Sequence, residues 1–331
     1  MSTVAEKAKI FLELVKFEHS IFALPYAYIG ALYGAHWVGR LSDDYAGGAL
    51  VGPAREAAGR VLDSVAGGGL VVGYDALNGG WPSWPSLLWI TVAMLGARSF
   101  AFVVNRAADK EIDSRNPRTA GRAVPAGRIA AWELWIFAVA VLGVFLFSVW
   151  QLAPVTRWLW PVVLAAFIFY PYTKRFTPLC HYWLGLCLGL APVGAWVAVG
   201  APLADPAPWV LGLAVTLWTA GFDIIYATQD VACDIRDGVH SMPADRGVAA
   251  ALAQTRLAHV LTVAFLAIGG YLAVAGWPWY LAVGVAAALL WYENRMVRAD
   301  DLSRVNAAFF TVNGVIAIVV FAGALADRLL G

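Results

Sequence analysis

Long apolar runs alternate with short segments rich in glycine, proline and charge along this chain of 331 residues. A helix that crosses a bilayer needs about 20 predominantly apolar residues. The runs predict nine such spans, near residues 10–36, 84–108, 130–150, 158–173, 180–200, 207–228, 251–275, 278–296 and 305–326. We therefore predict an all-α polytopic membrane protein that forms a single domain over residues 1–331.

The segment between the first two spans, about 37–83, fits this pattern poorly because it is rich in glycine and other small residues. We expect an external loop insertion there. The stretch PAREAAGRVLDSVAGG leaves open the alternative of a short amphipathic helix on the outer surface. The first span begins with charged residues and has no small-residue cleavage site, which indicates that the N-terminus is retained.

Composition supports the membrane assignment. The chain is 61% hydrophobic and 14% charged, whereas soluble domains are roughly 45–50% apolar and about 25% charged. These proportions exclude an ordinary soluble enzyme. A net charge of +1 gives no reason to expect a nucleic-acid partner. The three cysteines lack the paired spacing of a zinc site and do not indicate disulfides.

The distribution of positive charge predicts an orientation, because cytoplasmic loops collect Lys and Arg. With the N-terminus inside, 17 of the 23 Lys and Arg residues fall on the cytoplasmic side, 5 fall outside and Arg98 lies within a span. We therefore predict an integral protein of the cell inner or plasma membrane, with its N-terminus and the motifs described next on the cytoplasmic side.

Two acidic motifs lie at the predicted cytoplasmic ends of the second and sixth spans. Side chains four residues apart stack along one face of a helix. In the first motif, such a face contains Asn105, Asp109 and Asp113. In the second motif, it contains Asp223, Tyr226, Asp230 and Asp234. Asp230 and Asp234 follow Asp109 and Asp113 by the same interval of 121 residues. This match indicates a pseudo-repeat in which two carboxylate clusters face each other.

Facing carboxylates repel each other unless a cation neutralises them. Hard oxygen ligands select Mg²⁺ or Ca²⁺, and Mg²⁺ is commonly bound by one or two carboxylates together with substrate phosphates. Basic groups suited to phosphate lie on the same side, namely Lys174 and Arg175 beside Tyr170, and Arg118 and Arg122 after the first motif. The pattern predicts a metal-bound diphosphate; boundary charges solvated by cytoplasm are the alternative interpretation.

These residues resemble the motifs of the UbiA superfamily of intramembrane prenyltransferases. That family has an Asn-Asp-x-x-Asp-x-x-x-Asp-like motif, a Tyr-x-x-x-Lys element and an Asp-x-x-Tyr-Ala-x-x-Asp-x-x-x-Asp motif. The sequence matches them, in order, at Asn105, Asp109 and Asp113, at Tyr170 and Lys174, and at Asp223, Tyr226, Ala227, Asp230 and Asp234. Arg106 departs from the pattern, because many members carry Asp at that position.

The resemblance implies a nine-helix bundle whose central cavity opens laterally to membrane lipid. It implies that Mg²⁺ binds a polyprenyl diphosphate and is itself held by Asn105, Asp109, Asp113, Asp230 and Asp234. Lys174, Arg118, Arg122 and Tyr170 would assist in substrate binding. Catalytic roles are implied for Asp109, Asp230 and Lys174, and also for Asp223 and Tyr226, which could orient Lys174 or shield an allylic cation.

The segments KFEHSIFALPYAY, GARSFAFVVNR and NPRTAGRAVPAG resemble the subgroup labelled 4-hydroxybenzoate polyprenyltransferase-like, some of which is associated with menaquinone made by the futalosine route. The acceptor implied is an aromatic carboxylate of ubiquinone or menaquinone biosynthesis, either 4-hydroxybenzoate or 1,4-dihydroxy-6-naphthoate. A haem, chlorophyll or glycerol-lipid acceptor is the alternative within the family. An ion-coupled transporter is the alternative outside it, although carboxylates gathered at one membrane face argue against transport.

Three more polar residues within spans are candidates for substrate binding. Arg98 shares a helix face with the first motif, so we expect it to contact the acceptor carboxylate or the diphosphate. Glu18 and His19 form an inward polar pair in the first span. This pair could serve as a general base or bind the acceptor phenol, or it could make a polar contact between helices. The remaining histidines, His181 among them, carry no motif.

Overall fold

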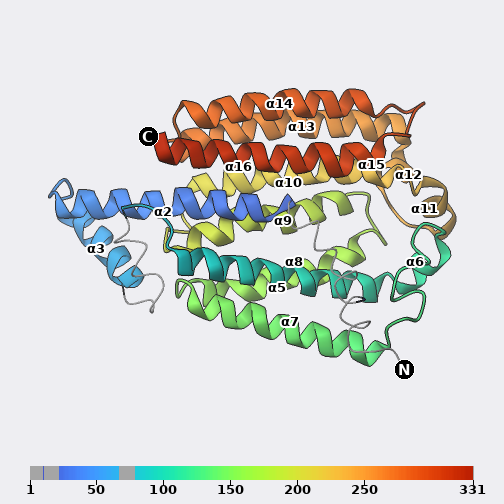
Figure 1. Ribbon diagram of the computed structural model, residues 1–331, viewed down its shortest axis with the longest axis horizontal. Coiled ribbons are helices and arrows are strands. Elements are labelled where there is room, and N and C mark those ends of the chain that lie inside the picture. The colour runs from blue at the N-terminus through green and yellow to red at the C-terminus, as the bar shows by residue number, and fades with distance from the viewer. Residues whose placement is uncertain (1–9, 11–21, 67–78, 331) are drawn as a thin grey trace.

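The computed structural model describes residue 10, residues 22–66 and residues 79–330. This part of the chain is a bundle of long helices without any named strand (Figure 1). In chain order the elements are α2 (Leu24–Ala46), α3 (Gly52–Ala66), α5 (Trp84–Ala108), α6 (Lys110–Arg115), α7 (Ala131–Gln151), α8 (Thr156–Thr173), α9 (Cys180–Ala198), α10 (Pro206–Ala227), α11 (Val231–Asp237), α12 (Met242–Arg246), α13 (Val248–Leu272), α14 (Trp277–Met296), α15 (Val305–Ala307), the π-helical turn η2 (Ala308–Val312) and α16 (Asn313–Leu330). The all-α prediction is confirmed for these residues.

Six helical segments in the described part of the chain are long and apolar enough to cross a membrane. They are α5, α7, α9, α10, α13 and the segment Val305–Leu330. The long helices α2, α8 and α14 coincide with the other predicted spans without meeting the same criterion, so a count of nine membrane crossings stays a prediction. From the second to the eighth span, the predicted boundaries agree with the helices within three residues.

The helix that contains the end of the first predicted span is longer than that span. Instead of stopping at residue 36, α2 continues to Ala46 and ends at Gly47 and Gly48, the second of which has a φ of +72°. Hydropathy falls at Arg40, but no residue there breaks the helix. The N-terminus and the predicted pair Glu18 and His19 lie outside the described residues.

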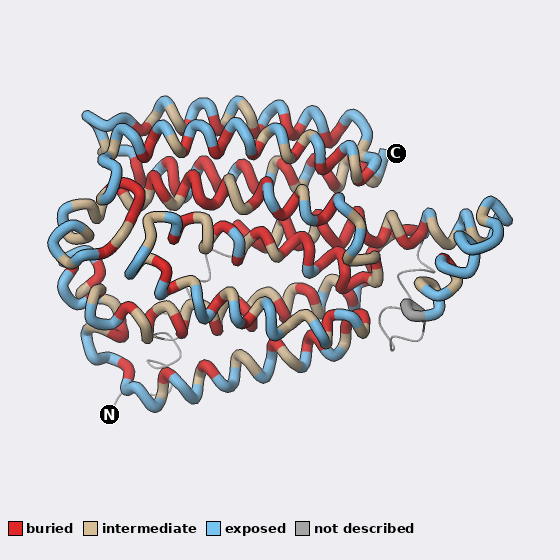
Figure 2. The backbone as a smooth tube through the Cα atoms, turned by 180° about the vertical axis from the view of Figure 1, so that it is seen from behind, coloured by how far each residue is buried: buried red, intermediate tan, exposed pale blue. Residues whose placement is uncertain are grey.

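Within the segment 37–83, Gly52–Ala66 forms the helix α3, which agrees with the alternative of a short helix rather than with a loop. A cation–π contact connects α3 to the end of α2: the guanidinium carbon of Arg55 lies 4.4 Å from the ring centroid of Tyr45. Arg55 also donates a hydrogen bond to the carbonyl of Tyr45 at 3.0 Å. Figures 1 and 2 show α3 beside the protruding end of α2, beyond the bundle and largely exposed. Its location on the outer side of the membrane stays a prediction.

The centre of the bundle is packed around α9 and α10. Trp196, Trp218 and Trp279 are each at most 1% exposed, and the inward faces of the helices are buried along most of their length (Figure 2). Glycines allow the helix backbones to approach closely. A Cβ atom on Gly30 of α2 would collide with the main-chain carbonyl of Pro192 in α9, and one on Gly185 would collide with that of Thr216 in α10.

We expect Gly30→Ala to lower the free energy of unfolding by roughly 2 kcal/mol, because the added methyl group meets main chain that cannot rotate away. Gly143→Ala in α7 is the matched control, since a Cβ atom there meets open space and alanine favours a helix. Thermal unfolding in detergent measures both. Equal midpoints for the two variants would contradict the close approach of α2 and α9.

Candidate active site

The two acidic motifs share a break in the helix. The long helices α5 and α10 end at Ala108 and Ala227, and the short helices α6 and α11 then begin after Asp109 and Asp230. Both aspartates have nearly the same backbone angles, with φ of −95° and −106° and ψ of 2° and 1°. The expectation that each motif follows one straight helix face is therefore wrong, whereas the matched spacing of the two motifs corresponds to a matched local backbone.

Asp109 is the most enclosed carboxylate of the first motif, with 3% of its surface exposed. Its Oδ2 atom accepts hydrogen bonds from Lys174 Nζ at 2.6 Å and from Asn105 Nδ2 at 3.0 Å. Its Oδ1 atom is buried and has no hydrogen-bond partner among the described residues. Burial raises the pKa of Asp109 above its usual range, and the charge of Lys174 opposes this shift.

Asp113 lies one turn further on and is held by two arginines. Arg122 Nη1 lies 2.9 Å from both carboxylate oxygens, and Arg106 Nη1 lies 3.3 Å from Oδ2. Arg106 is itself only 8% exposed. The arginine that departs from the family pattern therefore compensates the charge of the nearest acidic residue.

The loop after the first motif reaches across to the second. Asp230 accepts hydrogen bonds from Arg118 Nε at 2.9 Å, from Arg118 Nη2, and from Asn116 Nδ2 at 2.7 Å. Arg118 Nη1 also donates to the Tyr226 hydroxyl at 3.0 Å. Arg118 and Asp230 are 112 residues apart in sequence. The structure thus brings the loop after the first motif into contact with the second motif.

Asp234 lies one turn after Asp230, where Ser241 Oγ donates a hydrogen bond to it at 2.8 Å. Burial raises the pKa of Asp234 to about 6, although the Ser241 hydrogen bond opposes the shift. The following chain also fixes Lys174, because the backbone N–H of His240 donates to the Lys174 carbonyl at 2.7 Å. Lys174 is thereby positioned by its contact with Asp109 of the first motif and by the segment that follows the second motif.

Asp223 has a partner that the sequence analysis missed. His181 Nδ1 lies 2.7 Å from Asp223 Oδ2, and His181 Nε2 accepts the backbone N–H of Met242 at 3.2 Å. Because Nε2 accepts, the ring hydrogen sits on Nδ1 and is donated to Asp223. His181 is only 3% exposed. No spacing in the sequence pointed to it, since it belongs to a different helix from Asp223.

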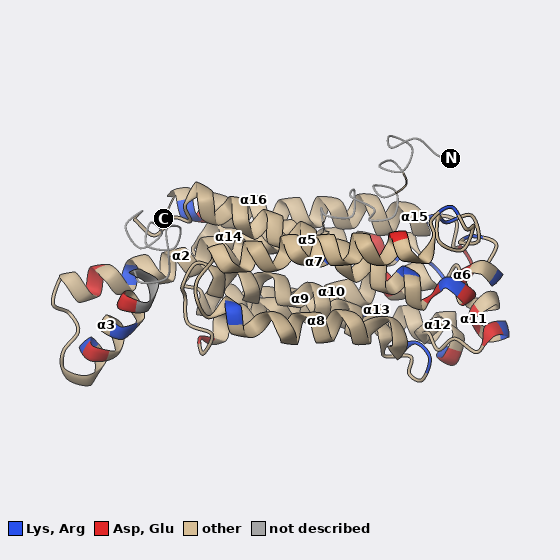
Figure 3. Cartoon of the chain, turned by 90° about the horizontal axis from the view of Figure 1, so that it is seen from below, with Lys and Arg blue, Asp and Glu red and all other residues tan. Residues whose placement is uncertain are grey.

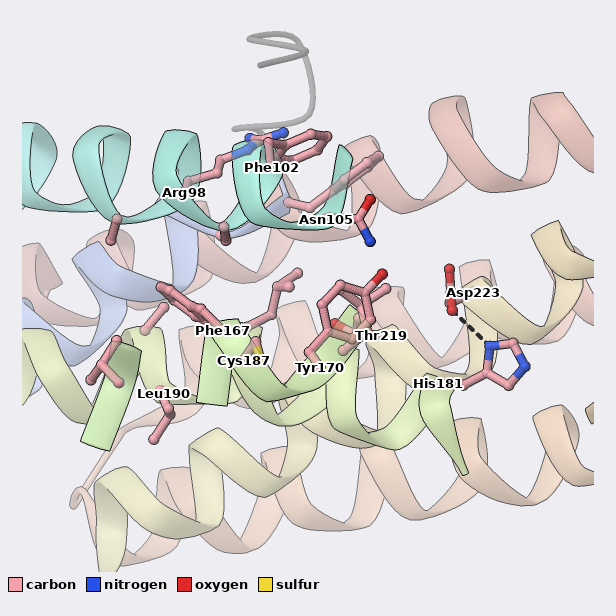
Figure 4. Close-up of a pocket in the computed structure, with 18 of the residues that line it drawn as sticks. Arg98, Phe102, Asn105, Phe167, Tyr170, His181, Cys187, Leu190, Thr219 and Asp223 are labelled. Atoms are coloured by element: carbon pink, nitrogen blue, oxygen red, sulfur yellow. Dashed lines mark hydrogen bonds and ion pairs between the residues drawn. The ribbon is translucent and has the colours of Figure 1, made fainter. Parts of the chain in front are cut away.

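A cavity of about 840 Å³ joins these groups to the interior of the bundle. Its polar end includes Asp109, Asp230 and Lys174. The rest is lined mainly by apolar side chains of α5, α7, α8, α9 and α10, for example Ile90, Phe167, Leu188, Val197 and Trp209. Figure 4 shows Asn105 pointing toward Asp223 across the cavity, with Tyr170 and Thr219 between the helices. Figure 3 shows charged residues gathered at the ends of the bundle.

The sequence model of the UbiA prenyltransferase family matches residues 68–315. The chain belongs to this family. A 4-hydroxybenzoate octaprenyltransferase of Cupriavidus necator is 33% identical over 250 residues, which cover 74% of this chain and 85% of that protein. The protein of the same name from Tolumonas auensis is 32% identical over 246 residues, with the same coverage of 74% and 85%. The UbiA-family chain is therefore an enzyme, a prenyltransferase, rather than an ion-coupled transporter.

Solved structures share the fold of this UbiA-family enzyme. A UbiA homolog from Aeropyrum pernix K1, solved without ligands, has a TM-score of 0.73 and 28% identity, with 94% of this chain and 98% of that chain covered. A UbiA homolog from Archaeoglobus fulgidus, solved with GPP and Mg²⁺, has a TM-score of 0.63 and 17% identity, with 97% and 99% covered. The predicted UbiA-type bundle is confirmed at the level of the fold.

The predicted substrate-binding residues of the UbiA-family enzyme reach the same cavity. Arg98, Tyr170, Arg118 and Arg122 all line it. The guanidinium carbon of Arg98 lies 5.0 Å from the ring centroid of Phe102 on the α5 side of the cavity (Figure 4). Glu18 and His19 cannot be placed, because they lie outside the described residues.

Sequence reasoning missed other lining residues besides His181. The turn η2 brings Phe309 and Phe310 to the cavity, and the ring centroids of Phe309 and Tyr226 are 4.3 Å apart. Asn116 was also missed. The apolar run over residues 305–326 gave no signal for these aromatic residues, because a π-helical turn changes which side chains face inward.

The predicted metal ligands do not converge on one point. The described residues contain no group of three or more His, Cys, Asp or Glu side chains placed to hold a metal ion, and Asp113 is occupied by its two arginines. A divalent cation nevertheless fits, because the buried Oδ1 atom of Asp109 lacks a partner and Mg²⁺ takes few protein ligands when substrate phosphates supply the others. The residues match a shared metal–substrate site rather than a cage made by the protein alone.

Proposed function

We propose that this UbiA-family enzyme transfers a polyprenyl group from a polyprenyl diphosphate to an aromatic carboxylate acceptor, 4-hydroxybenzoate or 1,4-dihydroxy-6-naphthoate, in quinone biosynthesis. One observation carries the proposal: paired acidic and basic groups lie at one end of a cavity whose remaining length is apolar. A charged head group and a hydrocarbon tail match these two parts. The name shared by the Cupriavidus and Tolumonas relatives supports an aromatic acceptor.

The ion pairs of the site can be exchanged for contacts with substrate. Lys174 is paired with Asp109, and Arg118 is paired with Asp230. A diphosphate offers both cations a ligand of higher charge than one carboxylate. Binding would therefore draw Lys174 and Arg118 toward the diphosphate and leave carboxylate oxygens of both motifs available to metal.

Mg²⁺ held by Asp109 and Asp230, with Asn105, Asp113 and Asp234 nearby, would supply charge neutralisation for the leaving diphosphate. The fold neighbour solved with GPP and Mg²⁺ agrees with this choice of ion. Lys174, Arg118 and Arg122 add fixed positive charge around the departing group. The protein's share of catalysis is thus to hold the diphosphate while the allylic carbon–oxygen bond breaks.

The apolar part of the cavity accommodates the polyprenyl chain of the donor. Its side chains exclude water, which would otherwise capture the allylic cation before the acceptor ring attacks. The adjacent, tilted rings of Tyr226 and Phe309 both line the cavity, and aromatic rings attract a cation. The guanidinium carbon of Arg118 already lies 5.1 Å from the Tyr226 ring centroid. His181 holds Asp223 in place beside them. The acceptor ring then forms the new carbon–carbon bond and loses a proton to restore aromaticity.

The test is diphosphate release from a labelled polyprenyl donor by purified protein in lipid vesicles, with Mg²⁺ and with each acceptor offered separately. We expect labelled product with 4-hydroxybenzoate or with 1,4-dihydroxy-6-naphthoate, and none after removal of Mg²⁺ by EDTA. Product formed only with a porphyrin, a chlorophyll precursor or a glycerol lipid would overturn the proposed acceptor.

We expect Arg98→Gln to raise the KM for the acceptor about tenfold, because a charge-assisted hydrogen bond to the acceptor carboxylate is lost. Arg98→Lys should retain most of the affinity, since the charge remains. Initial rates at varied acceptor and saturating donor provide the measurement. For an acceptor analogue without the carboxylate, wild type and Arg98→Gln should have the same KM. An unchanged KM of Arg98→Gln for the normal acceptor would exclude this role.

A further inference from the structure

A second cavity lies between α13 and α14. It is a groove of about 730 Å³. Its lining is part basic and part apolar. The basic part consists of Arg256, Arg295 and Arg298. The apolar and aromatic part includes Val260, Val263, Leu290 and Trp291. None of these residues lines the cavity of about 840 Å³ that contains the two acidic motifs. The groove is therefore a separate feature of the fold.

The arginines leave this groove with a surplus of positive charge. Arg298 lies 3.3 Å from the carboxylate of Asp300, but among the described residues neither Arg256 nor Arg295 forms an ion pair with an acidic side chain. Arg295 instead stacks on the ring of Trp291, with 4.3 Å between its guanidinium carbon and the ring centroid. Two cations with no acidic partner in the described part of the chain are therefore available to a ligand.

The acidic residue nearest to Arg295 in sequence, Glu293, does not neutralise the charge of the arginines. Glu293 is completely buried, and Asn313 Nδ2 donates to its Oε1 at 2.6 Å. His259 and Asn294 line the inner wall of the groove and are hydrogen-bonded to each other at 2.7 Å. Asn294 and the Nδ1 atom of His259 are thus hydrogen-bonded within the bundle, whereas the buried Nε2 atom of His259 has no hydrogen-bond partner among the described residues. The arginines carry the positive charge of the groove.

The remainder of the groove faces outward. Val260 is 67% exposed and Trp291 is 60% exposed, on helices that form the outer layer in Figure 1. The C-terminal end of α14, which carries Arg295, lies at the same end of the bundle as α11 and α12 (Figure 1). Tryptophan is enriched at the level of lipid head groups. Arginines therefore lie at the predicted membrane boundary, with an exposed apolar surface directly adjoining them.

We propose that this groove binds an anionic glycerophospholipid, whose phosphate pairs with Arg256 and Arg295 and whose acyl chain lies along Val260 and Val263. Basic pockets between membrane helices on the cytoplasmic side recognise anionic head groups. Charge complementarity selects the anionic lipid over a zwitterionic one. The adjoining apolar surface selects a lipid over free phosphate, because phosphate alone leaves that surface uncovered.

Native mass spectrometry of the full chain in detergent tests the proposal by titration with phosphatidylglycerol, phosphatidylcholine or inorganic phosphate. We expect phosphatidylglycerol to bind the wild type tightly, and Arg256→Gln/Arg295→Gln to weaken that binding about tenfold. Arg256→Lys/Arg295→Lys should retain it. The matched control is Arg246→Gln, which removes an exposed arginine of α12 outside the groove and should bind like wild type.

Three results would overturn the proposal: equal binding of phosphatidylglycerol and phosphatidylcholine, equal binding by the wild type and the double Gln variant, or inorganic phosphate binding as tightly as the lipid. The measurement uses no prenyl donor and no acceptor. Its outcome is therefore independent of the reaction assigned to the other cavity.

Discussion

Asp109→Asn and Asp230→Asn should each lower prenyl transfer on the order of a thousandfold. Each substitution removes a charge that a divalent cation requires while nearly preserving the size of the side chain. Each also leaves a cation, Lys174 or Arg118, without its carboxylate. The measurement is the rate of product formation from a labelled polyprenyl diphosphate at saturating Mg²⁺.

Glu111→Gln provides the matched control for these two variants. Glu111 lies on the exposed side of α6, between Asp109 and Asp113 in sequence, so its neutralisation changes the local net charge equally without altering the cavity. We expect its rate to be close to that of the wild type. If Asp109→Asn kept a tenth of the wild-type rate with the same Mg²⁺ dependence, the first motif would not be the metal ligand.

Lys174→Met should lower turnover on the order of a hundredfold, because a fixed positive charge beside the departing diphosphate is lost. It should also destabilise the protein. Asp109 would remain buried without its ion-pair partner, and we expect a loss of about 2 kcal/mol, a value reduced from that of a fully buried pair because the Lys174 side chain is 24% exposed.

A double variant separates the two effects of Lys174. In Lys174→Met/Asp109→Asn the buried charge is gone, so the midpoint of thermal unfolding should recover toward wild type while turnover stays low. Lys110→Met, which removes an exposed lysine of α6, should change neither quantity. Because the double variant also lacks the Asp109 carboxylate, its turnover is compared with that of Asp109→Asn alone. Equal rates in these two variants would mean that Lys174 serves only to neutralise Asp109.

The apolar pattern determined most of the fold in advance. Seven consecutive helices, from α5 to α14 apart from the short ones, begin and end close to the predicted boundaries, because a bilayer requires uninterrupted apolar length and backbone hydrogen bonds satisfied within the segment. The same criterion failed at α2 and α3. There the helices continue beyond the apolar run, and hydropathy carries no information about a helix outside such a run.

The sequence by itself also identified acidic residues that line one cavity, since the repeated spacing of Asp109 and Asp113 with Asp230 and Asp234 corresponds to matched helix breaks. Only the tertiary structure decided which groups meet. The pairing of Arg118 with Asp230 joins the two halves of the chain, and that of His181 with Asp223 joins two helices. Spacing predicts neighbours along one helix, whereas contacts between helices depend on how their faces rotate and cross.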